Sequence, residues 1–416
     1  MTHAWLTGLV RRDLFPPGLV AAMLAFAGLP LYVHTPRYYA EAVGVDLAAL
    51  GAVLLASRAL DSVQDPLIGR LADRWPGRRE PWALVSGCLL VTGFAVLFAP
   101  PQWGQPLPRL AIGLVAAFTG FSALQIALYD HGLALAERVG GGYTRIALWR
   151  EAGGLVGICL AALAPVALGS ILGLPSGFAA YAAVFSLLAL LALVRMRGRW
   201  LATAANSHTP RFAQALRAPG VGPMLAFGFV NSLPVAVTST LFLFFVADIL
   251  LAEAHAGAML VVFFASAAAA APAWARLSGW IGRKSALTAG MTLSVAVFLW
   301  AFTLGAGDAA IFYVIAAASG AALGADMTLA PAMLAACIRG GGGQVFSVWT
   351  FLQKSALAVA AGGALTALGL AGYEPGTADA AALAALAAAY ALVPCALKLL
   401  AIPFLWIFVT DPGDSV

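Results

Sequence analysis

Two aspartates inside an apolar stretch are the first residues of this sequence that could do chemistry. Asp61 and Asp65 lie within an apolar run at about 47 to 69. Residues four apart on a helix lie one turn apart on the same face, so the two carboxylates would repel each other. A proton or a hard cation such as Na⁺ would offset that repulsion. We therefore predict a cation site at Asp61 and Asp65, with further oxygens from Gln64 and, on another helix, Ser122.

A structural alternative exists for the acidic pair, because Arg58 precedes Asp61 by three residues and could neutralise it. Lys354 is a second candidate, about ten residues after Gln344 in another apolar run. That spacing corresponds to roughly 15 Å of helix, the middle of a hydrocarbon core about 30 Å thick. An ammonium at that depth needs an anionic partner. The partner would be a carboxylate of the Asp61 and Asp65 pair or an anionic substrate.

Other charged residues inside apolar runs have competing interpretations. Arg150 adjoins Glu151, so it either contacts a substrate or forms an ion pair near a helix end. Asp130 adjoins His131, which raises the hypothesis of a proton relay. Adjacent helical residues point about 100° apart, so a structural role is favoured for this pair.

Two charged residues of the second half remain without an assigned role. Asp326 follows Gly324 in the tenth apolar run and is either a polar site or a contact between helices. Lys398 lies deep in the twelfth run, and the sequence offers no evident partner for it. A structural role is favoured for Lys398.

The elements that carry these residues must be membrane helices. Of the 416 residues, 62% are hydrophobic and only 10% are charged, with a mean hydropathy of +0.92. Soluble domains carry about 25% charged residues, so this composition excludes a soluble domain and a nucleic-acid-binding module. The five histidines are scattered and form no HExxH motif, so we do not expect an enzyme. The four cysteines show no CxxC spacing, which leaves neither a disulfide framework nor a zinc site.

The apolar runs divide into six and six. They lie at about 17 to 38, 47 to 69, 82 to 100, 108 to 135, 146 to 172, 176 to 195, 221 to 250, 255 to 277, 284 to 305, 309 to 337, 346 to 371 and 380 to 409. Runs of about 20 apolar residues predict membrane-spanning helices. We expect an all-α polytopic membrane protein with bundles at 1–195 and 221–416 and a cytoplasmic central loop at 196–220.

The basic residues predict the orientation of the chain in the membrane. Of the 23 Lys and Arg residues, four lie inside the runs and two, Arg37 and Arg109, fall on one side. The remaining seventeen fall on the other side, which the positive-inside rule assigns to the cytoplasm. Both termini are therefore expected in the cytoplasm. Because Arg outnumbers Lys, which is typical of GC-rich coding, we expect a bacterial inner membrane.

A charged loop follows the second run and recurs, diminished, after the eighth. The first copy includes Gly69, Arg70, Asp73, Arg74, Arg78 and Arg79, and the second includes Arg276, Arg283 and Lys284. Arginines and carboxylates in such a loop could form ion pairs that hold one conformation, so we interpret it as a gating loop. The recurrence indicates a parallel internal repeat of six helices.

These features together resemble a known superfamily of membrane proteins. The repeated loop and the layout of six and six helices resemble the major facilitator superfamily. The segment from Arg58 to Gly69, RALDSVQDPLIG, is similar to the signature of its glycoside-pentoside-hexuronide:cation symporter branch, the melibiose permease group. Further similarity lies at Tyr38 to Gly44, Trp149 to Glu151, Val348 to Lys354, and Gly372 to Pro375.

The resemblance implies transport by alternating access, coupled to Na⁺ or H⁺. It implies that Asp61 and Asp65 bind the coupling ion and that Lys354 couples charge between the halves. It also implies that Arg150 and Tyr32 lie by the substrate, with Tyr129 as a stacking aromatic residue. A small-molecule substrate, surrounding membrane lipids and a monomer follow, with no cofactor besides the ion.

Two departures from the branch bear on the substrate. Relatives that transport sugars carry acids on the first and fourth helices, where this chain has Ala25 and Gln125. Gln125 is then a candidate substrate contact in place of the acid. We expect a sugar or glycoside-like solute, and the alternative is a lysolipid, amphiphile or organic anion.

Overall fold

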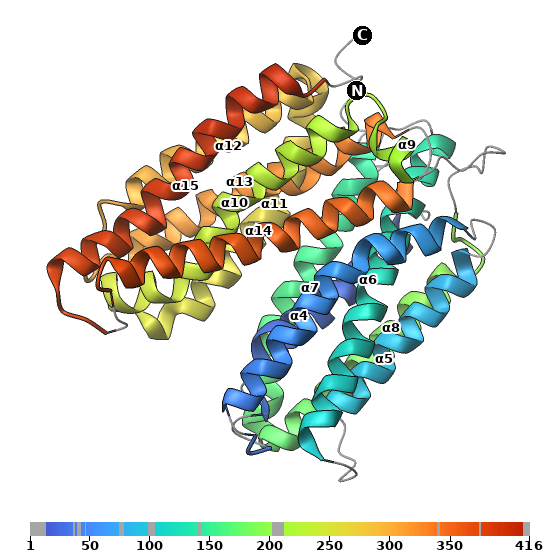
Figure 1. The fold of residues 1–416 in the computed structure, drawn as a ribbon, viewed down its shortest axis with the longest axis horizontal. Helices are drawn as coiled ribbons and strands as arrows, with labels where there is room; N and C mark the ends of the chain where they lie inside the picture. The colour runs from blue at the N-terminus through green and yellow to red at the C-terminus, as the bar shows by residue number, and fades with distance from the viewer. Residues whose placement is uncertain are drawn as a thin grey trace. The chain divides into compact units, whose positions relative to one another are not determined.

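The chain folds into long helices. The computed structural model describes residues 14–35, 38–39, 43–45, 47–74, 79–98, 105–139, 143–201, 212–338, 342–373 and 376–410. Within these residues the long helices are α2 (Phe15–Leu29), α4 (Leu47–Arg74), α5 (Arg79–Phe98), α6 (Pro106–Val139), α7 (Tyr143–Leu172), α8 (Leu174–Met196), α10 (Val221–Phe244), α11 (Ala256–Ile281), α12 (Arg283–Ala301), α13 (Ala309–Cys337), α14 (Gly342–Leu370) and α15 (Ala380–Phe408) (Figure 1). These twelve helices confirm the predicted all-α polytopic membrane fold.

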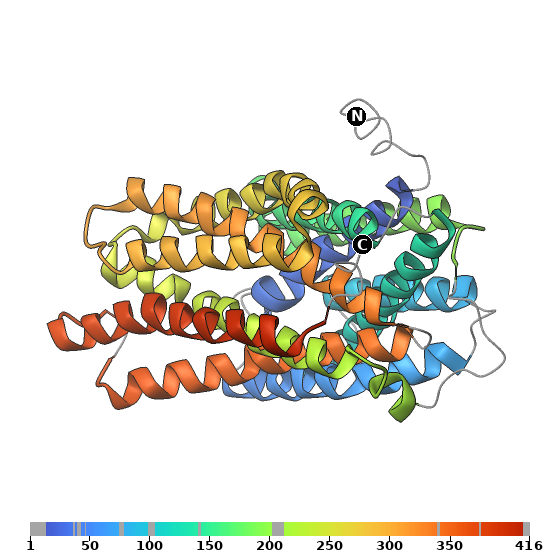
Figure 2. The same ribbon diagram turned by 90° about the horizontal axis from the view of Figure 1, so that it is seen from above.

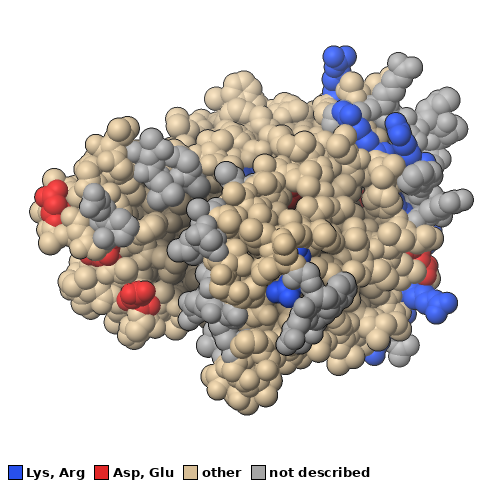
Figure 3. Space-filling model, turned by 60° about the horizontal axis from the view of Figure 1, so that its bottom comes forward, with Lys and Arg blue, Asp and Glu red and all other residues tan. Residues whose placement is uncertain are grey.

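Most of these helices are long and apolar enough to cross a bilayer. Among the described residues, nine helices meet that condition, and α2, α4 and α14 complete the set of twelve. The face seen in Figure 3 is made largely of uncharged residues, as a surface in contact with lipid requires. Many large apolar side chains on the helices are exposed, for example Leu187, Leu400 and Ile407.

Contacts along the chain define two compact units. The first comprises Met1–Ala215 with Arg339–Val348, and the second comprises Leu216–Ile338 with Trp349–Val416. In the first unit α6 packs on α4 and α5, while α8 packs on α2, α5 and α7. In the second unit α13 packs on α11 and α12, while α15 packs on α10 and α12 (Figures 1 and 2). In both units the fourth helix packs on the second and third, and the sixth packs on the first and third, which supports the internal repeat.

The first and last helices of each unit meet through the same kind of aromatic contact. Phe26 of α2 stacks on Tyr181 of α8, with ring centroids 4.6 Å apart. In the second unit Phe245 stacks on Tyr390 of α15 at 4.1 Å. Phe245 begins the π-helix η4 (Phe245–Ile249), which follows α10, and the π-helix η1 (Pro30–His34) follows α2. Burying such rings accounts for much of the packing of each bundle.

The charged segments after the second and eighth runs are largely helical, which corrects the predicted loops. Gly69 and Arg74 lie inside α4, and Arg276 lies inside α11. Arg283 is the first residue of α12. A helix extends past the apolar part of its sequence because charged side chains at its end reach water. Hydropathy alone therefore places these helix ends too early.

The start of the third helix of each unit is tied to the end of the sixth. The Gly198 amide, after α8, donates to a carboxylate oxygen of Glu80 at 2.9 Å. In the second unit the Lys284 ammonium donates to the Val409 carbonyl, after α15, at 2.8 Å. The two links use different chemistry at the same place in the repeat. They fix the end of each sixth helix.

Gly69 allows α4 to pack closely on the beginning of α14. A Cβ at Gly69 would lie 2.3 Å from the Ser347 hydroxyl oxygen and 2.7 Å from the Gly343 carbonyl oxygen. Atoms cannot approach that closely, so any larger residue must push the two helices apart. Gly69 is therefore the position at which α4 and α14 can come into close contact.

We expect Gly69→Ala to lower the free energy of unfolding by about 1–3 kcal/mol, because it overpacks this contact. Gly154→Ala is the matched control, since Gly154 lies in α7 with no neighbouring atom within 4 Å of its added Cβ. Thermal unfolding in detergent measures both variants. Equal melting temperatures for the two would contradict the close contact.

Hydrogen bonds to Asp248, at the end of η4, hold Tyr373 and the segment between α14 and α15 in place. The Tyr373 hydroxyl donates to Asp248, and the Gly376 amide donates to the same carboxylate oxygen at 3.0 Å. Burial, followed by the hydrogen bond to Asp248 and its charge, raises the pKa of Tyr373 above its usual value of 10.0. The phenol therefore remains protonated at a pH where an exposed tyrosine ionises.

The raised pKa predicts an alkaline limit for this contact. Its stabilising effect is fully present below about pH 10 and is lost as the pH rises through the higher value in the folded state. We expect the phenolate absorbance that is absent in Tyr373→Phe to appear well above pH 10, where an exposed tyrosine ionises. If that difference titrates near pH 10 in folded protein, the Tyr373 contact with Asp248 is wrong.

Candidate cation site and buried charges

Asp61 lies in a cluster of oxygen-bearing side chains contributed by α4 and α6. Its side chain is buried, and its Oδ1 accepts from the Ser122 hydroxyl at 3.0 Å and from the Gln64 amide at 3.3 Å. The Gln64 amide oxygen in turn accepts from the Thr119 hydroxyl at 2.9 Å. Three of the predicted residues, Asp61, Gln64 and Ser122, are thus joined by hydrogen bonds.

Asp65 lies one turn further along the same helix and is fully buried. Arg58, by contrast, has an exposed side chain. Asp61 lies fourteen residues after Leu47, the first residue of α4, or about 21 Å along a helix of 28 residues. The two carboxylates are therefore in the middle of a membrane-length helix, where an uncompensated charge is costly.

The oxygen atoms of this cluster suit a monovalent hard cation or a proton. Carboxylate, hydroxyl and amide oxygens are the ligands that hard cations prefer. Within the described residues no group of three or more His, Cys, Asp or Glu could hold a metal ion together. Transition metals favour nitrogen and sulfur ligands, whereas the groups around Asp61 offer oxygen atoms, which suit Na⁺ or H⁺ better.

Thr119 was not identified from the sequence, although its position gives a signal. It lies three residues before Ser122 on α6, so the two hydroxyls share one face of that helix. A search for hydroxyls at helical spacing around Ser122 would have found it.

Arg150 forms a compact cluster with three neighbours in the first unit. Its guanidinium donates from Nε and Nη2 to one Glu151 oxygen, at 2.8 and 2.5 Å, and from Nη1 to the Tyr143 hydroxyl at 2.7 Å. It also lies over the Tyr129 ring, 4.1 Å from the ring centroid. The structure thus contains the ion pair that was one of the two interpretations of Arg150.

Tyr129 lies between Arg150 and an aromatic ring of α14. It stacks on Phe346 with a centroid distance of 4.6 Å, and it is buried like Arg150 and Tyr143. Tyr129 is thus in contact with both the guanidinium and the Phe346 ring, and little of it is exposed. A substrate could stack on Tyr129 only after Arg150 or Phe346 moves.

The other predicted substrate residues lie on α14, α6 and η1. Lys354 is half-buried, twelve residues after the start of α14, which corresponds to about 18 Å along that helix. Gln125 is half-buried on α6, one turn from Ser122. Tyr32 belongs to η1, and its side chain lies outside the described residues.

The predicted gating residues divide between buried and exposed positions. Arg79, the first residue of α5, is buried and forms a 2.9 Å ion pair with the fully buried Asp130 of α6. Its Nη1 also donates to the Ala72 carbonyl of α4 at 2.9 Å. This arginine therefore joins three helices of the first unit.

The remaining gating residues make weaker or undescribed contacts. Arg283 donates to the Ala332 carbonyl of α13 at 3.4 Å, at the place in the repeat where Arg79 meets Asp130. Arg74 is exposed and Arg276 is half-buried. Arg78 and the side chain of Asp73 lie outside the described residues.

His131 faces a different partner from Asp130, as expected for adjacent residues. Its Nδ1 accepts from the Leu201 amide at 3.1 Å, after the end of α8. Asp130 instead forms an ion pair with Arg79. The two side chains serve separate contacts, which supports the structural interpretation over a proton relay.

Lys398 has two partners that the sequence did not suggest. Its ammonium donates to an Asp326 oxygen at 2.5 Å and to the Asn231 amide oxygen at 2.7 Å. The Asn231 amide donates to the other Asp326 oxygen at 3.0 Å. Asn231 is a polar residue in the middle of the seventh apolar run, and that position was the missed signal.

We expect Arg79→Ala to destabilise the protein by about 3–5 kcal/mol, because it leaves the Asp130 charge buried without its ion-pair partner. Arg79→Met combined with Asp130→Leu removes both charges and should recover most of the loss. Arg74→Ala removes an exposed arginine and is the control. A loss for Arg79→Ala no larger than for Arg74→Ala, in thermal or denaturant unfolding, would contradict this role.

Comparisons with known proteins match nearly the whole chain. The family model described as MFS/sugar transport protein matches residues 14–411. One similar solved structure is described as a bacterial homologue of iron transporter ferroportin in outward-facing state. It is 15% identical, with a TM-score of 0.67, covering 94% of this chain and 99% of that one.

A second structure, of such a homologue with soaked iron, has a TM-score of 0.65 at 15% identity. It covers 95% of this chain and 98% of that one. At this identity the likeness concerns the fold alone.

Proposed function

Because the chain belongs to the MFS/sugar transport protein family, we propose that it is a secondary active transporter, coupled to Na⁺ or H⁺, of a small sugar or glycoside-like solute. The observation that carries the proposal is the buried pair Asp61 and Asp65 with the hydroxyl and amide groups around Asp61. A protein that only held other proteins together would gain nothing from two carboxylates at mid-membrane depth.

The coupling ion would bind between α4 and α6. Asp61 and Asp65 provide the negative charge, and Ser122 and Gln64 already orient polar groups toward Asp61. When the ion leaves, two carboxylates one turn apart remain in a low-dielectric region, so the empty site strongly favours taking up Na⁺ or a proton. This difference between the loaded and the empty site would link ion binding to the conformation of the transporter.

The Arg150 cluster would take part in opening the substrate path. Arg150, Glu151, Tyr143 and Tyr129 are buried together with Phe346 at the beginning of α14. In alternating access such contacts close one end of the path and separate when it opens. Arg150 and Tyr129 would then become available to a substrate, with Gln125, Lys354 and Tyr32 as the other proposed contacts.

A second candidate substrate class is an amphiphile such as a lysolipid, or an organic anion. It is favoured by Ala25 and Gln125, two uncharged and partly exposed positions where sugar-transporting relatives have acids. Iron, named for the structurally similar proteins, is disfavoured by the absence of a suitable ligand group in the described part of the chain.

We place the protein in a bacterial cytoplasmic membrane as a monomer with both termini in the cytoplasm. The positions of the basic residues support this orientation.

Ion binding can be tested before the substrate is known. In detergent we expect NaCl, but not KCl, to raise the melting temperature of the native protein if Na⁺ is the coupling ion, because a ligand stabilises the state that binds it. We expect Asp61→Asn and Asp65→Asn to abolish that shift. Glu137→Gln, which removes an exposed acid from the same helix as Ser122, should retain it.

Transport is tested in proteoliposomes with a radiolabelled methyl glycoside and with a labelled lysophospholipid, under a Na⁺ gradient and under a proton gradient. Gradient-driven uptake of the glycoside that falls at least tenfold in Asp65→Asn supports the proposal. Uptake of only the lysophospholipid selects the second substrate class. Gradient-driven uptake that persists unchanged in Asp65→Asn would overturn the coupling role.

A further inference from the structure

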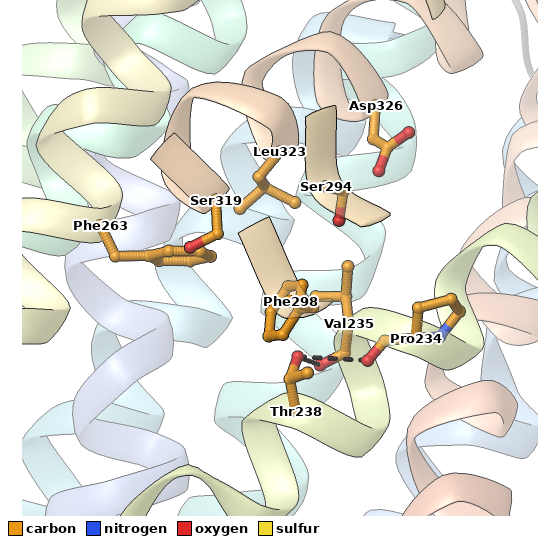
Figure 4. Close-up of a pocket in the computed structure, with 9 residues that line it drawn as sticks. All are labelled: Pro234, Val235, Thr238, Phe263, Ser294, Phe298, Ser319, Leu323 and Asp326. Atoms are coloured by element: carbon orange, nitrogen blue, oxygen red, sulfur yellow. Dashed lines mark hydrogen bonds between the residues drawn. The ribbon is translucent and has the colours of Figure 1, made fainter. Parts of the chain in front are cut away.

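The second unit carries its basic and its acidic side chains at opposite ends. Among the described residues, the end where α11 stops and α12 begins carries Arg217, Arg276, Arg283 and Lys284. The opposite end carries Asp248, Glu253, Asp308 and Asp379. In the interior, Asp326 lies near Ser294 (Figure 4) and pairs with Lys398. No described carboxylate of this unit is therefore available at the basic end.

Lys284 and Trp406 lie side by side at this basic end. Lys284 is the second residue of α12, and Trp406 lies two residues before α15 ends at Phe408. The Lys284 ammonium lies over the Trp406 ring, 4.9 Å from its centroid. The indole Nε1 donates to the hydroxyl of Thr288, one turn after Lys284, at 3.0 Å. These contacts hold the ammonium and the ring together where α12 packs on α15.

The Lys284 ammonium has hydrogen-bonding capacity left. An ammonium donates three hydrogen bonds, and the described residues accept one of them, at the Val409 carbonyl 2.8 Å away. The carbonyl oxygen and the face of the Trp406 ring both attract a cation, but neither carries a full negative charge. Lys284 is only half-buried, so the remaining donors can be reached from outside. The position suits an anion.

The surroundings of this ammonium show which kind of anion fits. Trp406, Ile407 and Phe408 are exposed at the end of α15. At the same end of the unit Trp280, the penultimate residue of α11, is 83% exposed. Tryptophan at the end of a membrane helix lies at the level of the lipid headgroups. An anion that also covers such apolar side chains is a lipid, because a free inorganic anion would leave them uncovered.

We propose that Lys284 and Trp406 bind the headgroup phosphate of an anionic phospholipid where α12 and α15 meet. The phosphate accepts from the remaining donors of Lys284, and the indole packs against the glycerol part of the lipid. A zwitterionic lipid binds less well, because its own cation lies close to Lys284. Basic sites between membrane helices recognise anionic headgroups in this way. The site is separate from Asp61 and Asp65 and does not depend on the proposed transport function.

The test compares two phospholipids with the same acyl chains, phosphatidylglycerol and phosphatidylcholine. Each is added to the full chain in an uncharged detergent, in a KCl buffer without Na⁺. We expect phosphatidylglycerol to raise the melting temperature by about 2–4 °C at saturation and phosphatidylcholine to raise it less. Potassium phosphate at the same concentration should leave it unchanged. Asp65→Asn should keep the lipid effect, which separates this site from the coupling site.

Lys284→Gln removes the charge and keeps a donor for the Val409 carbonyl. We expect this variant to need about fivefold more phosphatidylglycerol for the same shift, the effect of one basic residue at an anionic lipid surface. Lys284→Arg should bind within twofold of the native protein. Arg217→Gln, which removes an exposed basic residue from the same end, is the matched control and should also stay within twofold. If Lys284→Gln does not fold, Trp406→Leu replaces it and should weaken binding at least twofold.

Four results would overturn the proposal. The first is a melting temperature that phosphatidylglycerol does not raise, and the second is an equal rise with phosphatidylcholine. The third is an equal rise with potassium phosphate, because the ligand is then a free anion. The fourth is a loss in Lys284→Gln no larger than in Arg217→Gln, because the lipid then responds only to the total charge of the basic end.

Discussion

The free-energy cost of burying a charge away from water governs how the helices pack within each unit. In the described residues, Arg79 pairs with Asp130, Arg150 with Glu151, and Lys398 with Asp326, and each pair is buried or nearly so. Removing one member of such a pair costs far more than removing both. The helices that carry the pairs therefore have to meet at fixed depths, and the packing of glycines and aromatic rings around them follows from that requirement.

The fold could be predicted from sequence because membrane-spanning helices require long apolar segments, and these are visible directly in the amino-acid composition along the chain. Apolar runs of about 20 residues and the one-sided distribution of basic residues were sufficient for twelve helices in two related halves. The ends of the helices were less predictable. Gly69 and Arg276 were assigned to loops, because hydropathy detects the hydrocarbon core and not the charged turns that continue a helix beyond it.

Contacts between residues close together in the sequence could be predicted, whereas contacts between residues far apart in the sequence could not. Asp61 and Gln64 lie on one helix face, so their spacing indicated their contact, and Ser122 was predicted as a further oxygen from another helix. The pairing of Arg79 with Asp130 spans 51 positions and that of Asp326 with Lys398 spans 72. No periodicity in a single sequence links residues so far apart. Such contacts depend on which helices pack together and at what depth.

The pairing of Arg150 with its neighbour in sequence, Glu151, has a consequence for the electrical behaviour of the protein. Two opposite charges on adjacent residues move as one neutral unit, so a displacement of Arg150 together with Glu151 carries almost no net charge through the membrane field. The same holds for Lys398 and Asp326 as long as α13 and α15 move together. Each unpaired elementary charge that crosses the field contributes about 2.3 kcal/mol per 100 mV. A displacement of these two pairs would therefore contribute little to any voltage sensitivity of the protein.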